Sequence, residues 1–261
     1  MKAEITTATV LGSNMSYFAF HLVFTLPPIC LLSLFQRQPL AGIGGLKVWL
    51  ALPLIALIAL IYTTPWDNYL IWRDVSHYGE DRVVGTIGYV PVEEYLFFLL
   101  QPVLTGLWLY WLLAHKTPVP QEHSTVARIV GTGFWVVLSI AGAVMLQWHS
   151  GVYLGLILVW AGPILALQWV VGGAQLWATK STWLLGTLIP TLYLWFADRF
   201  AIERGIWSIS DIYTTGLHLF DLPIEEATFF LVTNLLVVQG LLLFLLLKPQ
   251  LNLFEVGKKV T

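Results

Sequence analysis

The stretch Pro91-Val92-Glu93-Glu94-Tyr95-Leu96-Phe97-Phe98 returns later in the chain as Pro223-Ile224-Glu225-Glu226-Ala227-Thr228-Phe229-Phe230. Each copy opens a long apolar run. Each is also preceded by an aspartate at the end of another apolar run, Asp67 in the first copy and Asp198 in the second. Carboxyl groups are costly at such positions, so a duplicated set is the strongest pointer to both the fold and the function.

The composition places this set in a membrane. Of the 261 residues, 57% are hydrophobic and only 11% are charged, against roughly 25% charged in an ordinary soluble domain. Because backbone groups in lipid must bond internally, the apolar runs predict an all-α, integral membrane helix bundle. Seven runs approach the length of about 20 residues that crosses a bilayer: 17–35, 46–63, 92–114, 129–147, 152–171, 183–197 and 224–247.

Other features narrow the class of protein. A net charge of −2 argues against a nucleic-acid partner. The first run follows no basic segment, so we interpret it as a retained span rather than a signal peptide. No polar stretch is long enough for a second domain, so we expect one membrane domain over 1–261. The glycine cluster at 42–45 follows a span rather than a strand, which is not the start of a dinucleotide fold. We therefore expect no redox cofactor, and the histidine spacing predicts no metal site.

The two motifs also predict a topology. An even number of crossings separates the loops at 64–91 and 198–222, so both should lie on one membrane face. Three spans per copy plus one unmatched span give two parallel three-helix repeats, at 15–114 and 152–247, joined by a linker helix at 128–147. We expect the six motif carboxyl groups to converge on a shared cavity: Asp67, Glu93, Glu94, Asp198, Glu225 and Glu226.

Basic residues predict the orientation of the multi-pass chain in the cell membrane. Eight Lys and Arg residues fall on the side of the carboxyl terminus and five on the other side. This bias favours a cytoplasmic carboxyl terminus and an amino terminus outside the cell.

Two interpretations of the motif compete. A proline followed by acidic residues is an ordinary helix start, stabilised by about 0.3–1 kcal/mol per carboxylate at the helix dipole. However, helical spacing places a carboxyl group, two aromatic rings and a polar group on one face in both copies. A carboxylic acid beside aromatic rings suits protonation of an alkene and stabilisation of the resulting carbocation. The stripes are Glu94, Phe97, Phe98, Gln101 and Glu226, Phe229, Phe230, Thr233.

These residues resemble the membrane-embedded, flavin-independent lycopene cyclase family of archaea, some bacteria and fungi. The resemblance is carried by Thr64-Pro65-Trp66-Asp67-Asn68-Tyr69, by the run from Gly85 to Phe98, and by the run from Pro223 to Asn234. It extends over essentially the whole chain. Some relatives have two separate halves that associate, and here both halves look fused. The segment 73–78 departs from the family, because it is more polar than the stretch expected there.

The resemblance implies a function. Lycopene would be cyclised at its ends to γ-carotene and then to β-carotene, with no atoms gained or lost and no cofactor. The implied catalytic residues are Glu93, Glu94, Glu225 and Glu226, with Asp67 and Asp198 as companions; which of them is the acid stays open. Expected partners are lycopene and carotenoid intermediates, the lipid bilayer, and other enzymes of the carotenoid pathway. The candidate substrate-binding residues are Trp66, Tyr69, Tyr95, Phe97, Phe98, Gln101, Trp195, Phe229, Phe230, Thr233 and Asn234.

Three alternatives remain at this point. Small sugar transporters share the three-plus-one-plus-three arrangement, although their sites lie at the midplane. Membrane prenyltransferases hold Mg²⁺ on clustered aspartates, and the spacing of Asp67, Asp74 and Asp81 does not form such a cluster. A carotenoid hydratase or monocyclase would use the same cation. Whether one cavity or two operate is also open.

Overall fold

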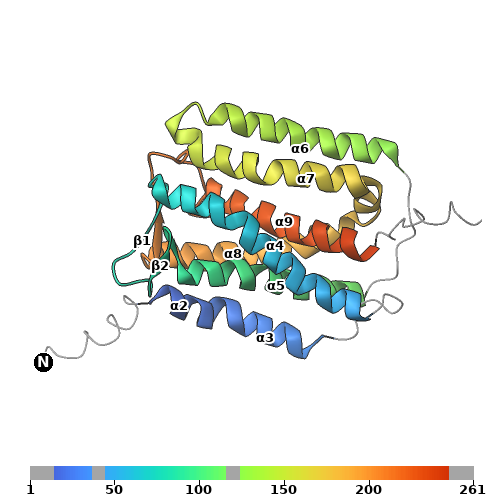
Figure 1. The fold of residues 1–261 in the computed structure, drawn as a ribbon, viewed down its shortest axis with the longest axis horizontal. Coiled ribbons are helices and arrows are strands. Elements are labelled where there is room, and N and C mark those ends of the chain that lie inside the picture. The colour runs from blue at the N-terminus through green and yellow to red at the C-terminus, as the bar shows by residue number, and fades with distance from the viewer. Residues whose placement is uncertain (1–14, 37–44, 116–123, 247–261) are drawn as a thin grey trace, which may run out of the picture.

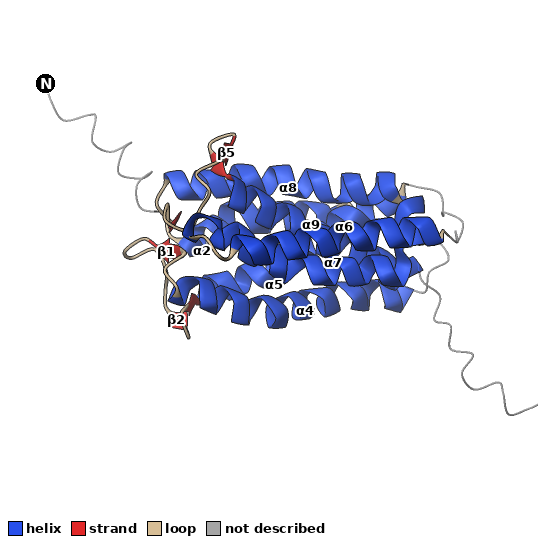
Figure 2. Cartoon of the chain, turned by 90° about the horizontal axis from the view of Figure 1, so that it is seen from above, coloured by secondary structure: helices blue, strands red, loops and turns tan. Residues whose placement is uncertain are grey.

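The computed structural model describes residues 15–36, 45–115 and 124–246. In this part of the chain, seven long helical segments lie side by side with their axes roughly parallel (Figures 1 and 2). The predicted all-α membrane bundle is therefore confirmed. The segments are the continuous run of α2 (Tyr17–Phe20), η1 (His21–Thr25) and α3 (Leu26–Leu34), then α4 (Gly45–Trp72), α5 (Val92–Ala114), α6 (Thr125–Met145), α7 (Val152–Ala178), α8 (Lys180–Glu203) and α9 (Ile224–Leu246).

Six of these segments are long and apolar enough to cross a membrane; α8 falls short by composition. At 24 residues, α8 is nevertheless about 36 Å long at 1.5 Å per residue. It packs against α5 and α9 within the bundle. The predicted span 183–197 was too short at both ends, because the helix runs on through charged residues to Glu203. Asp198 therefore lies on a helix.

The helix α4 corrects the prediction of a span over 46–63 and a loop from 64. It continues to Trp72 and contains both Pro53 and Pro65. Prolines are tolerated in membrane helices because neighbouring groups satisfy the freed carbonyls. Pro65 frees the carbonyl of Ile61, four residues earlier. Nearby, the Thr64 hydroxyl donates to the Leu60 carbonyl at 2.6 Å, and the Asn68 side chain donates to the Thr64 carbonyl at 2.8 Å. The loop starts after Trp72, and Asp67 is helical.

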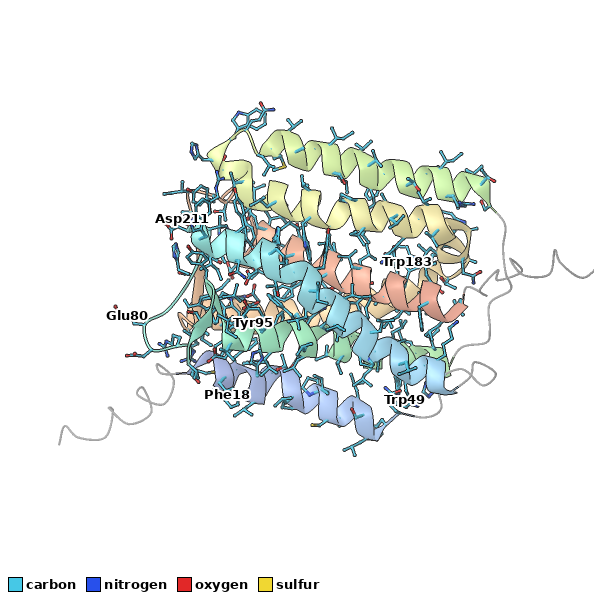
Figure 3. The ribbon with its side chains drawn as sticks, in the orientation of Figure 1. Phe18, Trp49, Glu80, Tyr95, Trp183 and Asp211 are labelled. Atoms are coloured by element: carbon cyan, nitrogen blue, oxygen red, sulfur yellow. The ribbon has the colours of Figure 1, made fainter. Side chains whose placement is uncertain are left out.

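Both motif loops lie at the same end of the bundle (Figure 1). The strand β1 (Ser76–Tyr78) of the first loop pairs antiparallel with β4 (Trp207–Ile209) of the second, with His77 opposite Ser208. Figure 3 shows Glu80 and Asp211, which belong to these loops, at this end. Each loop then forms a short hairpin before the motif helix: β2 (Thr86–Ile87) with β3 (Val90–Pro91), and β5 (His218–Leu219) with β6 (Leu222–Pro223).

The backbone contacts of the two loops correspond closely. The amide of Val92 donates to the Gly85 carbonyl, and the amide of Ile224 donates to the Leu217 carbonyl, each at 2.9 Å. Gly79 donates to Ile206 of the other loop at 3.1 Å. In the reverse direction, Ser210 donates to Val75 at 2.9 Å. Because these bonds set where each helix begins, both Pro-x-Glu-Glu segments start their helices in the same way.

The helix α6 lies at the edge of the bundle and packs along α7 (Figure 1). We predicted the linker helix over 128–147, and α6 spans Thr125–Met145. Small residues let the two backbones approach, as is common between membrane helices. A Cβ atom on Gly142 would lie 2.9 Å from the Gly155 carbonyl, and one on Gly155 would lie 2.7 Å from the Gly142 carbonyl. The helix α6 thus packs closely along α7.

Candidate active site

The first glutamate of each motif faces its own loop. Glu93 accepts a hydrogen bond from the Val84 amide at 2.8 Å, and Glu225 accepts one from the Thr215 amide at 2.7 Å. Both side chains are buried. Each therefore joins the start of a motif helix to the backbone of the loop that precedes it.

The second glutamate of each motif faces the interior. Glu94 Oε2 accepts hydrogen bonds from the Tyr17 hydroxyl at 2.6 Å and the Tyr78 hydroxyl at 3.0 Å. Glu226 Oε1 accepts one from the Tyr153 hydroxyl at 2.6 Å. Burial, together with the nearby Glu94 carboxylate, raises the pKa of Tyr78 well above its ordinary value, so this phenol keeps its proton. These phenols fix the direction in which the glutamates point.

The two aspartates complete the set. Asp67 on α4 and Asp198 on α8 are both buried. Asp198 Oδ1 accepts a hydrogen bond from the Trp207 indole at 2.8 Å. Among the described residues, Oδ2 of Asp67 and Oδ2 of Asp198 have no hydrogen-bond partner. Each aspartate therefore keeps one oxygen that accepts no hydrogen bond from the described residues.

Glu94, Glu226, Asp67 and Asp198 line a single cavity of about 60 Å³, which we call the acidic chamber. The two halves of the chain contribute two carboxyl groups each. The ion pairs found in the described part of the chain join other side chains, such as Arg199 with Glu203. Aromatic and aliphatic side chains form the rest of the wall: Tyr17, Phe20, Trp66, Leu70, Tyr78, Phe97, Tyr153, Leu194, Trp207, Ile209, Phe229 and Phe230, with Ser76.

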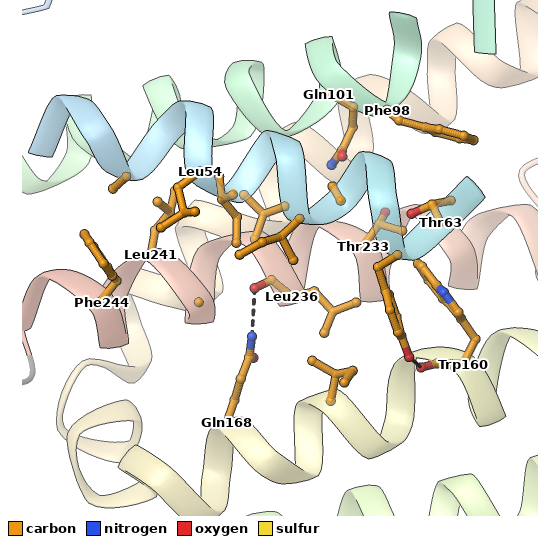
Figure 4. Close-up of a pocket in the computed structure, with 18 of the residues that line it drawn as sticks. Leu54, Thr63, Phe98, Gln101, Trp160, Gln168, Thr233, Leu236, Leu241 and Phe244 are labelled. Atoms are coloured by element: carbon orange, nitrogen blue, oxygen red, sulfur yellow. Dashed lines mark hydrogen bonds between the residues drawn. The ribbon is translucent and has the colours of Figure 1, made fainter. Parts of the chain in front are cut away.

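A second, larger cavity adjoins the chamber. This apolar groove has a volume of about 300 Å³ and lies between α4, α5, α7 and α9 (Figure 4). Phe97 and Phe229 line both cavities. The ring of Trp66 stacks on Phe229 with centroids 5.5 Å apart and on Trp160 at 4.9 Å. The groove and the acidic chamber therefore meet at a wall of aromatic rings.

The structure brings most of the predicted site residues to these cavities. Of the six carboxyl groups, Glu93 and Glu225 lie outside the chamber, for the reason given above. Trp66, Phe230 and the shared Phe97 and Phe229 line the chamber. Phe98, Gln101 and Thr233 line the groove.

Four predicted substrate-binding residues line neither cavity. Tyr69 is partly exposed and accepts a hydrogen bond from Arg73 at 2.6 Å. Tyr95 donates to the Ile87 carbonyl at 2.8 Å, and Trp195 donates to the Ala227 carbonyl at 3.0 Å. Asn234 is buried and bonds Gln101, Thr105 and Thr191 between helices.

Sequence reasoning missed the phenols of the chamber. Tyr17 and Tyr153 each stand at the start of an apolar run, one in each half of the chain. This shared position is the one sequence signal that could have identified them. It also missed His21, which lies in the π-helical turn η1 and is buried. Its Nε2 donates to the Glu93 carbonyl at 2.8 Å, and its ring stacks on Tyr17 at 4.8 Å. His21 thus joins the first helical segment to the start of α5.

The fold and the chamber together define a membrane-embedded helix bundle with an acidic, aromatic-lined cavity beside an apolar groove. The chain is 42% identical over 238 residues to the lycopene beta-cyclase of Halobacterium salinarum, covering 88% of this chain and 95% of that protein. It is 38% identical to a bifunctional lycopene cyclase/phytoene synthase of Leptosphaeria maculans, covering 88% of this chain and 41% of that protein. The chain belongs to the lycopene cyclase family, and the resemblance is confirmed.

The other comparisons give no match: neither a family model nor a solved structure is similar to the chain.

Proposed function

We propose that this protein is an enzyme that cyclises the ends of lycopene to β-rings, giving β-carotene by way of γ-carotene. Family membership supports the substrate. The observation that carries the chemistry is the acidic chamber, in which four carboxyl groups from both halves of the chain share one aromatic-lined cavity. Four carboxylates in one small cavity repel one another, so we expect the set to hold protons that can be given to a substrate.

The proposed reaction conserves every atom. A carboxylic acid donates its proton to the terminal double bond of lycopene, which leaves a tertiary carbocation. A neighbouring double bond attacks this cation and closes a six-membered ring through a new carbon–carbon bond. A carboxylate then removes a proton from the ring, which restores a double bond and returns the proton to the enzyme. The aromatic side chains of Trp66, Phe97 and Phe229 line the chamber and would stabilise the cation.

Hydrogen-bond donors suggest how the carboxyl groups divide these roles. Glu94 accepts from two phenols and Glu226 from one. A group that only accepts suits an ionised carboxylate, and hence the base. Oδ2 of Asp67 and of Asp198 receives no donor from the described residues. Such an oxygen can carry the proton. Because Asp198 accepts a hydrogen bond from Trp207 on its other oxygen, as Glu226 does from Tyr153, we assign the acid to Asp67, which accepts from none of the described residues.

The proposal includes the organisation of the chain. The matching loop contacts support two repeats, 15–114 and 152–247, fused through α6. With the amino terminus outside the cell, the acidic chamber lies near the outer face of the cell membrane, because α2 begins at the chamber end (Figure 1). Other enzymes of the carotenoid pathway are proposed partners.

Expression in a lycopene-accumulating host tests the function. We expect β-ring carotenoids with the same mass as lycopene, and deuterium in each new ring when the cells or membranes are supplied with D₂O. Unchanged lycopene would overturn the proposal. A product heavier than lycopene by the mass of one water would instead identify the protein as a hydratase.

A further inference from the structure

We propose that the apolar groove holds the uncyclised part of the polyene, which enters from the bilayer between α4 and α7 and is cyclised at one end per binding event. This inference rests on the proposed function and deepens it. It concerns residues that the motif does not include, notably Leu54, Ile58, Tyr62, Trp160 and Ile164.

The first argument is the chemistry of the groove. Most of its polar side chains direct their donors to the protein: Tyr62 to the Trp160 carbonyl at 2.8 Å, Gln168 to Leu236 at 3.0 Å, and Thr233 to Phe229 at 2.8 Å. The first two bonds are visible in Figure 4. Gln101 donates to Asn234, and apart from Thr63 and the Trp160 indole nitrogen the remaining lining is aliphatic and aromatic. A ligand without hydrogen-bonding groups therefore fits this groove.

The second argument is length and access. Along α9 the lining runs from Phe229 at the chamber to Phe244, which is about 22 Å at 1.5 Å per residue. This is most of the bilayer core of about 30 Å. Leu54, Ile58 and Phe244 are among the exposed apolar residues of the bundle. A long hydrocarbon can therefore enter from the side, without passing through water.

The third argument is the passage into the chamber. The rings of Tyr62, Trp160, Trp66 and Phe229 stack in that order, with centroids 5.5, 4.9 and 5.5 Å apart and interplanar angles of 21°, 24° and 4°. A row of parallel flat rings suits a flat conjugated chain. This row leads from the groove to the acidic chamber.

One ring per binding event follows from the shared chamber. All four inward carboxyl groups serve one cavity, so the molecule has no separate chamber of this kind in each described half. The second end of the substrate must then leave and return reversed. The monocyclic intermediate should appear free in the bilayer.

Groove-filling variants test the proposal. Ala59→Trp from α4 and Ile164→Trp from α7 place an indole in the groove. Ile61→Trp is the matched control, because Ile61 is 65% exposed on the same helix and lines neither cavity. The proteins are purified in nanodiscs with lycopene. Bound carotenoid is measured by absorption in a Glu94→Gln background, and ring formation is measured in the otherwise wild-type chain.

We expect both groove variants to lose at least ten-fold in bound carotenoid and in cyclisation, while Ile61→Trp changes neither. Full binding and cyclisation in both groove variants would overturn the groove and leave the proposed function standing. If the wild-type chain forms no rings, the proposed function is wrong. The binding measurement then still shows whether the groove holds a carotenoid. With excess lycopene, we expect monocyclic product to exceed the enzyme many-fold before bicyclic product accumulates. Bicyclic product from the first turnovers, with no free monocyclic stage, would overturn the one-ended mode.

Discussion

The two halves of the molecule share the backbone arrangement of their motif loops but differ in the side-chain hydrogen bonds to their carboxyl groups. In the first half, Tyr17 and Tyr78 both donate to Glu94. In the second half, Tyr153 donates to Glu226, while the paired strand offers its Trp207 to Asp198 instead. The two copies of a repeated motif can therefore hold carboxyl groups with different hydrogen-bond partners, because the residues that donate those bonds lie outside the motif.

The lipid-facing sides of the halves differ as well. Tyr62 donates to the Trp160 carbonyl on one side, and Tyr193 donates to the Phe24 carbonyl on the other, each at 2.8 Å. Beside the first bond lies the groove. Beside the second, Phe24 packs on Phe200 with ring centroids 5.1 Å apart. The same interhelical bond thus borders an opening on one side and packed rings on the other.

The largest expected effect separates the glutamates within each motif. Glu94→Gln and Glu226→Gln should lower cyclisation by about 10²–10⁴-fold, the usual contribution of general acid–base catalysis. Both residues line the chamber. The measurement is the initial rate of ring formation in membranes with equal amounts of inserted protein.

The matched controls are Glu93→Gln and Glu225→Gln. Each amide keeps an oxygen that can accept from Val84 or Thr215. We expect these two variants to retain most of the activity. Losses as large as those at Glu94 and Glu226 would show that all four glutamates act in catalysis.

The phenols give the next largest effect. Tyr153→Phe removes the phenol that, among the described residues, donates to Glu226, whereas Tyr78→Phe leaves Tyr17 on Glu94. A hydrogen bond to a charged group contributes about 1.5–3 kcal/mol. We therefore expect Tyr153→Phe to slow cyclisation by roughly ten-fold or more and Tyr78→Phe by a few-fold. Both effects are measured as initial rates of cyclisation. Equal losses in the two variants would contradict the proposed difference between Glu94 and Glu226.

The smallest effect concerns the hairpin turns. Gly88 has φ +67°, and a Cβ there would lie 2.5 Å from Asn68 Oδ1. Gly88→Ala should lower the free energy of unfolding by about 1–2 kcal/mol, since a left-handed backbone and a close contact both penalise a side chain. Gly85→Ala is the control, because its Cβ meets nothing within 4 Å. Thermal unfolding in detergent would show the difference, and similar midpoints would contradict it.

Much of the fold could be predicted because its signals are local. The span at 92–114 coincides with α5, and 224–247 nearly coincides with α9, since each begins at the motif and is apolar throughout. The end of α4 could not be predicted, because Pro65 is an ordinary stop signal in a soluble helix, whereas helices within a membrane bundle tolerate proline.

The site was predictable in part for a similar reason. Asp67, Glu94, Asp198 and Glu226 stand out as charges in apolar runs. Glu93 points toward its own loop because it accepts from the Val84 amide. Glu94 accepts from Tyr17, which lies far away in the chain. Such contacts are settled by packing, which spacing along a helix does not reveal.

The acidic chamber takes walls from α2, the first described segment, and from α9, the last. During synthesis the earlier helices enter the membrane without their final partner. Glu94 and Tyr17 can meet at that stage, but Glu226 arrives with α9. The chamber is therefore enclosed only when α9 inserts, and a chain stalled before α9 carries three of the four chamber carboxyl groups and no enclosed place in which to use them.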